Sequence, residues 1–303
     1  MCIQVSKHTN PREKTMKKVL LATSALFLTA GVASAEITMS GSGQVSITST
    51  AGADNELNTH LDLNVAISGA ADNGMTFTTS VGYDAGRQAD YNDDYELDAA
   101  ETGWATGAPE VAIAYNGVTV TAQQNGVDNL FDDAAAEDLG IAGSFAGLSY
   151  GLTMDLNGSD SSYKLGYSVG DLTATVTGTN VAAVGGDASK IAVSYKMGDA
   201  TLSASAQNEN GSAEDDQTVG ISYSMGSVSF SYTSIKPGNG DFGDEWDAKV
   251  SFTQGAVSAY VTMDEADTTH MVAEYDLGGA TAFASSTSAT AGDFTAVGVS
   301  FAF

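Results

Sequence analysis

The densest run of oxygen ligands in this chain lies between residues 90 and 101. Its side chains occupy the first, third, fifth, seventh, ninth and twelfth places of a calcium-binding loop: Asp90, Asn92, Asp94, Glu96, Asp98 and Glu101. Hard oxygen ligands at this spacing can wrap one Ca²⁺, with the last glutamate binding through both oxygens. Tyr95 stands where such a loop needs glycine, and no helical pattern flanks it. The spacing predicts a structural Ca²⁺ site, and a solvated acidic surface loop is the alternative.

A second acidic cluster lies between residues 125 and 138. It comprises Asp128, Asp132, Asp133, Glu137 and Asp138. Leu130 and Phe131 interrupt the acidic residues with two large apolar side chains, which could pin the segment to a protein surface. The sequence alone leaves open whether this cluster faces an interior or the outside solvent.

Side chains for catalysis are scarce after residue 35. Cys2 is the single cysteine, and His60 and His270 are the histidines that follow the N-terminal region. A thiol nucleophile and a cysteine-based metal site are therefore excluded there, and no nucleophile motif accompanies the histidines. We expect no enzymatic activity and no cofactor other than the possible Ca²⁺.

Residues 1–35 are predicted to be an export region. Met16, Lys17 and Lys18 form a charged start, residues 19–29 form an apolar run too short to cross a bilayer, and Ala33 and Ala35 provide a small-residue cleavage site. We expect translation to start at Met16 and cleavage to follow Ala35, which leaves residues 36–303 as one domain. That domain keeps six basic and 37 acidic residues. Such a negative charge argues against nucleic acid as a partner.

After residue 36 the dominant pattern is alternation. In residues 189–197, Ile191, Val193 and Tyr195 share one face, whereas Lys190 and Lys196 share the other. A period of two indicates β-strands with an apolar and a polar face. Direct counting gives about 18 such segments.

The connections between these segments alternate in length. Tight turns with glycine are expected at 116–117, 170–171, 198–199, 226, 255 and 278–279. Longer acidic connections are expected at 49–57, 85–108, 125–138, 181–188, 208–216 and 236–244. Short periplasmic turns at one end and longer extracellular loops at the other are typical of outer-membrane barrels. The last strand ends on Phe303 with an apolar outward face, as a barrel needs where it closes in lipid. The fold class is therefore all-β, a closed antiparallel transmembrane barrel.

Four of the six cations after residue 35 are expected in the middle of strands: Lys164, Lys190, Lys196 and Lys249. Each opposes an apolar phase, and a lysine on the lipid face would cost roughly 2–4 kcal/mol at mid-depth. We therefore expect all four to face a water-filled lumen.

The chain resembles the general diffusion porins of Gram-negative outer membranes, in their alphaproteobacterial, Rhodobacter-like branch. The resemblance rests on the start at residues 16–20, the opening of the mature chain at residues 36–41, repeated Tyr-x-x-Gly hairpins and the terminal Phe303. It implies a barrel of 16 strands, a homotrimer in outer-membrane lipid and lipopolysaccharide, and Phe303 as the signal to the barrel-assembly machinery. It also implies that the loop after the fifth strand, residues 125–138, folds into the lumen as a constriction.

The function predicted from residues and resemblance together is passive diffusion of small hydrophilic solutes and ions, with weak cation selectivity from the acidic excess. The alternative is a non-conducting barrel with a structural or adhesive role. A substrate-specific channel would require an aromatic or charged ladder on the inner face, and the sequence shows none.

Overall fold

The computed structural model describes residues 35–93, 95–104, 108–131, 135–181, 186–208, 216–238, 241–290 and 292–303. The elements in these ranges are β-strands, as the alternation predicts. Their bounds are β1 (Glu36–Thr50), β2 (Glu56–Ala70), β3 (Thr76–Gly86), β4 (Ala89–Asp90), β5 (Glu96–Leu97), β6 (Glu101–Trp104), β7 (Glu110–Tyr115), β8 (Val118–Asp128), β9 (Ala135–Phe145), β10 (Leu148–Met154), β11 (Ser161–Val169), β12 (Leu172–Val181), β13 (Gly186–Met197), β14 (Ala200–Asn208), β15 (Asp216–Met225), β16 (Val228–Lys236), β17 (Glu245–Gln254), β18 (Val257–Asp264), β19 (Thr269–Asp276), β20 (Ala280–Ser288) and β21 (Phe294–Ala302). No helix among the described residues is long and apolar enough to cross a membrane.

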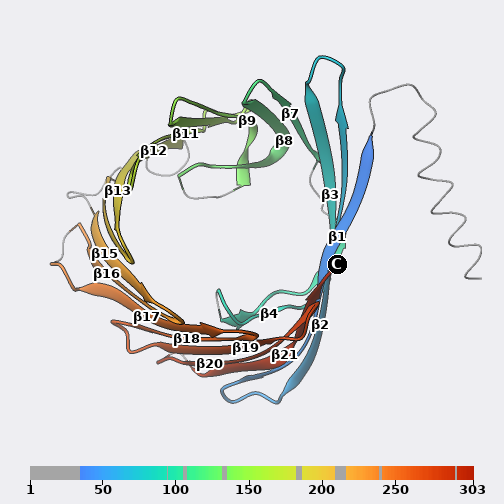
Figure 1. Cartoon of the computed structure of the whole chain (residues 1–303). Helices are drawn as coiled ribbons and strands as arrows, with labels where there is room; N and C mark the ends of the chain where they lie inside the picture. Colours follow the sequence, from blue (N-terminus) through green and yellow to red (C-terminus); the bar gives the residue numbers. More distant parts are fainter. Residues whose placement is uncertain are drawn as a thin grey trace, which may run out of the picture.

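The strands form a ring (Figure 1). Within the described ranges, 19 strands make one antiparallel sheet, and β6 and β7 both pair with β3, at its two ends. β6 and β7 follow one another along the same edge of β3 and together fill one strand position, so the 19 strands make a barrel of 18 positions. The direct count of about 18 is confirmed. The 16 strands implied by the resemblance are wrong for this chain, because each alternating run with its own turn forms a separate hydrogen-bonded strand.

Pairing of β1 with β21 closes the ring. Their register runs from Ser42 opposite Ala302 to Thr50 opposite Phe294. Among the described strands, closure leaves the barrel sheet without a free edge, which is the condition for a β-structure to lie in hydrocarbon without unpaired backbone groups.

The turns at one end of the barrel are as short as expected. Asn116 and Gly117 connect β7 to β8 with φ of 49° and 80°, the left-handed pair of a two-residue hairpin turn. Gly170, Gly198 and Gly226 also have positive φ in the tight turns that follow β11, β13 and β15. The residues between these turns are therefore fixed in register, and each strand keeps one apolar and one polar face.

Two segments leave the ring and enter its interior (Figure 1). One comprises residues 87–93 and 95–98 between β3 and β6 and contains the short pair β4–β5. We call it the inserted hairpin. The other comprises residues 123–131 and 135–138, with the end of β8 and the start of β9, where the ladder between these strands is irregular from Ala122 to Asp128. We call it the inward segment.

Candidate functional site: the barrel lumen

The inserted hairpin rests on the inner wall through its aromatic residues. Tyr91 stacks on Phe283 of β20 with ring centroids 3.8 Å apart, and Tyr95 stacks on His270 of β19 at 3.7 Å. The hydroxyl of Tyr91 donates to Glu274 at 2.8 Å. Burial and this carboxylate raise the pKa of Tyr91, so its phenol remains a neutral donor.

The base of the inserted hairpin is held by polar contacts to β1 and β2. The Gln44 side chain accepts from the backbone N of Ala89 at 2.8 Å and donates to the carbonyl of Ala89 at 3.1 Å. Arg87 forms an ion pair with Glu56 at 3.2 Å. Ala89 is fully buried. The hairpin is therefore fixed at its base and along its apolar face.

Residues of the inserted hairpin alternate between two faces. Ala89, Tyr91, Tyr95 and Leu97 belong to the cluster packed on the wall. Between them, Asn92, Asp93 and Glu96 are exposed. Asp90 and Glu96 are register partners in the β4–β5 pair. The hairpin thus presents a polar, acidic face away from the wall.

The inward segment lies on β10–β12. The backbone N of Leu130 donates to Ser162 at 2.8 Å, and the side chain of Asn129 donates to Thr179 at 2.9 Å. Leu130 covers Gly151, where an added β-carbon would lie 2.8 Å from the leucine side chain. A glycine in the inner wall therefore makes room for this segment.

The acidic residues assigned to the constriction have different surroundings. Glu137 is fully buried and accepts a hydrogen bond from Asn129 at 2.8 Å. Asp138 is buried and accepts from the backbone N of Asn125 and Leu156 at 2.8 and 3.0 Å. These two carboxylates anchor the foot of the inward segment, whereas Asp128 is exposed. Asp132 and Asp133 lie outside the described residues.

The four predicted lumen lysines share the face on which the two segments lie. Lys164 and Lys190 are both register partners of Thr177 on β12. Thr177 lies two residues before Thr179 and therefore on the same face, and Thr179 accepts the hydrogen bond from Asn129 of the inward segment. On the other wall, Lys196 and Lys249 belong to one row of register partners that crosses β13–β19 and ends at His270, the residue on which Tyr95 stacks. The row consists of Lys196, Thr201, Ser222, Ser231, Lys249, Thr262 and His270. Register partners point to the same side of a sheet. The side-chain N of Lys249 also lies 3.9 Å from the ring centre of Tyr260.

The predicted calcium ligands are not gathered around one point in the part of the chain that the structure describes. Asp90 and Glu96 lie in the inserted hairpin, whereas Glu101 lies on β6 opposite Gly86. Asp98 and Glu101 border a polar cavity of about 390 Å³, and Asp94 lies outside the described residues. No group of three or more His, Cys, Asp or Glu side chains in the described ranges is placed to hold a metal ion. In a strand pair, alternate residues point the same way rather than converging, so this conformation does not fit the expected cage.

Calcium binding therefore stays a prediction from the sequence. If the site forms, Ca²⁺ should raise the unfolding temperature of the purified barrel by a few degrees, because a ligand that binds the folded state stabilises it. Glu101→Gln should abolish the rise, and Glu110→Gln on β7 is a matched control outside the pattern. Identical melting with Ca²⁺ and with a chelator would contradict the prediction.

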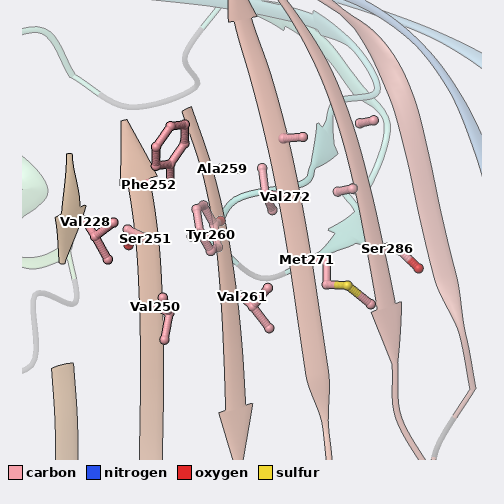
Figure 2. Close-up of a pocket in the computed structure, with 13 residues that line it drawn as sticks. Val228, Val250, Ser251, Phe252, Ala259, Tyr260, Val261, Met271, Val272 and Ser286 are labelled. Atoms are coloured by element: carbon pink, nitrogen blue, oxygen red, sulfur yellow. The ribbon is translucent and has the colours of Figure 1, made fainter. Parts of the chain in front are cut away.

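The outer wall carries the apolar phase. Large apolar side chains remain exposed there, including Val250, Phe252, Val261 and Met271. Figure 2 shows these residues on β17–β19, around an open groove of about 520 Å³ that also includes Ala259 and Ala273. Trp246 lies beside Tyr232 in the same phase, with ring centroids 6.2 Å apart. An apolar outer surface with aromatic residues suits contact with lipid.

Aromatic residues inside the barrel were missed by reasoning from the sequence. Tyr91, Tyr95, Tyr260 and Phe283 gather on one side of the lumen, although the sequence showed no aromatic ladder. The hydroxyl of Tyr260 donates to the carbonyl of Asn92 at 3.2 Å. These rings hold the inserted hairpin rather than forming a continuous track. The alternation of apolar residues at 89, 91, 95 and 97 was the signal that could have indicated a packed hairpin.

Comparison with known proteins supports the same architecture. Among solved structures, the chain is similar to two mutants of Rh. blastica porin, at 19% and 20% sequence identity, each with a TM-score of 0.55 and coverage of 88% of this chain and 100% of the other. A structure described as "Asymmetric conductivity of engineered proteins" is 21% identical, with the same TM-score and coverage. No family model and no curated protein matches the sequence. At such identities the likeness shows the fold, so the resemblance to porins is confirmed as a resemblance of fold.

Proposed function

We propose that this chain is an outer-membrane porin, a passive pore for small hydrophilic solutes and ions. The observation that carries the proposal is a closed barrel whose inner face is polar while its outer face is apolar. Within β12–β16 the inward phase consists largely of small hydroxyl-bearing residues, including Thr173, Thr175, Ser203 and Ser231. Such residues suit a water-filled lumen better than a packed core.

The outer-membrane location in a Gram-negative bacterium follows from the same two-faced wall. Closed barrels of this kind span bacterial outer membranes with an apolar band toward lipid. The export region at residues 1–35 would take the chain there, although residues 1–34 lie outside the described residues. A homotrimer in lipid and lipopolysaccharide, assembled with the help of the barrel-assembly machinery, is the arrangement that the sequence resemblance implies and belongs to this proposal.

Weak cation selectivity is the finer part of the proposal. The 37 acidic residues after residue 35 outnumber the six basic ones, which should give a negative potential at the pore mouth. Lys190 and Lys196 oppose this potential from within the lumen. Salt should screen the field, because exposed charges interact little beyond the Debye length.

Single-channel recording in planar bilayers tests both parts. We expect stepwise currents, and under a KCl gradient a reversal potential of the sign for cations that shrinks as salt rises. Removing two lumen cations with Lys190→Gln and Lys196→Gln should increase cation selectivity. Lys236→Gln is the control for each single substitution, since Lys236 lies on the phase of the outward Tyr232.

The outcomes separate the competing functions. A folded barrel that gives no current would overturn the pore and leave the structural or adhesive role. Currents with an anion-selective reversal potential would keep the pore and overturn the argument from charge.

A further inference from the structure

We propose that the inserted hairpin, residues 87–93 and 95–98, is a permanent constriction of the pore and sets its preference for cationic solutes. This inference rests on the proposed pore function. It assigns the narrowing of the lumen to the loop after β3, in addition to the loop after β8 that the resemblance implies.

The first step concerns rigidity. The hairpin is attached to four strands of the inner wall. The wall residues that it contacts are Gln44 on β1, Glu56 on β2, His270 on β19 and Phe283 on β20. Val272, under the same cluster, is 3% exposed. Burial of aromatic rings on both sides of a contact makes release costly, since each buries a large apolar surface. The hairpin is thus part of the wall rather than a flap.

The wall has a glycine beneath the aromatic ring that supports the hairpin. The ring of Phe283 that carries Tyr91 lies over Gly298 of β21, where a β-carbon would be 2.7 Å from a ring carbon. Glycine at this position lets Phe283 lie close to the sheet, which leaves space above it for a second ring. The wall under the inserted hairpin is therefore adapted to hold it.

The second step concerns position. The inserted hairpin lies on β18–β20 and the neighbouring β1, whereas the inward segment lies on β10–β12. In the ring, eight strand positions separate β11 from β20 in either direction. The two segments therefore project from opposite walls, as Figure 1 shows. Together they reduce a round lumen to a narrower passage.

The third step concerns charge. The face that the hairpin turns away from its wall carries exposed Asp93 and Glu96. Across the lumen, Lys164 and Lys190 lie on β11 and β13. Carboxylates fixed on a rigid hairpin in the narrowest part favour cations there, because low-dielectric walls focus their field. The solutes favoured are small hydrophilic cations.

The decisive experiment excises the hairpin. Gly86 and Glu101 are register partners at the ends of β3 and β6, so residues 88–99 can be replaced by a short Gly-Ser turn without moving the strands. We expect single-channel conductance to rise about twofold or more, with entry of larger sugars in liposome-swelling assays, because pore width limits both. Heat-modifiable migration on gels shows that the excised barrel is folded.

A second variant keeps the hairpin and removes its charge. Asp93→Asn with Glu96→Gln should move the reversal potential toward zero with little change in conductance at high salt. The matched control is Asp171→Asn with Asp199→Asn, an equal loss of charge in the tight turns at the other end of the barrel, and it should leave selectivity as in the wild type.

Each outcome has one meaning. A folded excised barrel with wild-type conductance and solute limit overturns the constriction, although the pore itself stands. If excision prevents folding, the variant with Asp93→Asn and Glu96→Gln tests the proposal. A reversal potential equal to that of its control overturns the role of the hairpin in selectivity. A wild-type barrel without any current means that the proposed function has failed, which is a different result from either.

Discussion

Replacing Gly86 with alanine should release the inserted hairpin from the wall and expose its base to proteolysis. Gly86 is the last residue of β3 and has a φ of 98°, a region that favours glycine. A β-carbon there would also overlap the carbonyl oxygen of Thr59, which accepts a hydrogen bond from the backbone N of Arg87 at 2.9 Å. Backbone strain alone costs about 1–3 kcal/mol, and the overlap adds to it.

An arginine-specific protease measures this effect directly. Arg87 is the single arginine after residue 35. In the wild type it is tied to Glu56 and to the carbonyl of Asp98, so cleavage should be slow. Gly86→Ala should be cut severalfold faster into two fragments of known mass, because local opening exposes the bond.

The control for this substitution lies on the same strand and the same face. A β-carbon at Gly82 would have no atom of the described residues within 4 Å, so Gly82→Ala adds the same methyl group without overlap. It should be cut at the wild-type rate. Equal cleavage of Gly86→Ala and wild type would mean that the path of the chain into the lumen does not depend on this glycine.

The strands of the barrel wall were predictable because the sequence signals for each strand lie within the strand and its adjacent turn. A period of two identifies each strand, and glycine in a tight turn marks where it ends, as at the end of β13 before Gly198 and Asp199. These signals lie within about ten residues of one another. The direct count of strands therefore agreed with the structure, whereas the number taken from the resemblance did not.

The inserted hairpin was not predictable in the same way. Its partners Phe283 and His270 lie far along the chain, and no local pattern states that residues 89–97 will meet them. The same alternation that spaces Asp90, Asn92 and Glu96 like calcium ligands also places them on one face of a hairpin. Sequence spacing alone could not separate these two arrangements, because both require a side chain at every second position.

Leu130 and the acidic residues of the inward segment have different surroundings. Leu130 contacts the wall, as its apolar character suggested, because a large apolar side chain finds room over Gly151. Glu137 and Asp138, however, are buried at the foot of the segment. Glu137 accepts from the side chain of Asn129, and Asp138 accepts from two backbone N–H groups. These contacts depend on the irregular path of β8, which periodicity does not encode.

Deleting Phe303 should remove most of the assembled barrel. Its backbone N donates to the carbonyl of Gly41 and its carbonyl accepts from the N of Gly41, both at 3.0 Å. Its ring covers Gly41, where a β-carbon would lie 2.9 Å from a ring carbon. Backbone groups left unpaired in lipid cost several kcal/mol each, so the seam between β1 and β21 should open from this end. The fraction of heat-modifiable protein on gels measures the loss, and an unchanged fraction would refute the prediction.

Two further comparisons separate closure from recognition by the assembly machinery. Phe303→Ala keeps the two backbone hydrogen bonds and removes the ring, whereas Phe303→Tyr keeps the hydrogen bonds and an aromatic ring. If backbone pairing closes the barrel, the alanine variant should assemble far better than the deletion. Refolding of purified chains into lipid vesicles contains no assembly machinery. If the deletion fails there as well, Phe303 acts through the seam itself. If the deletion refolds normally in vesicles but is lost in cells, the terminal aromatic acts as a signal, and the hydrogen bonds to Gly41 are not what makes it necessary.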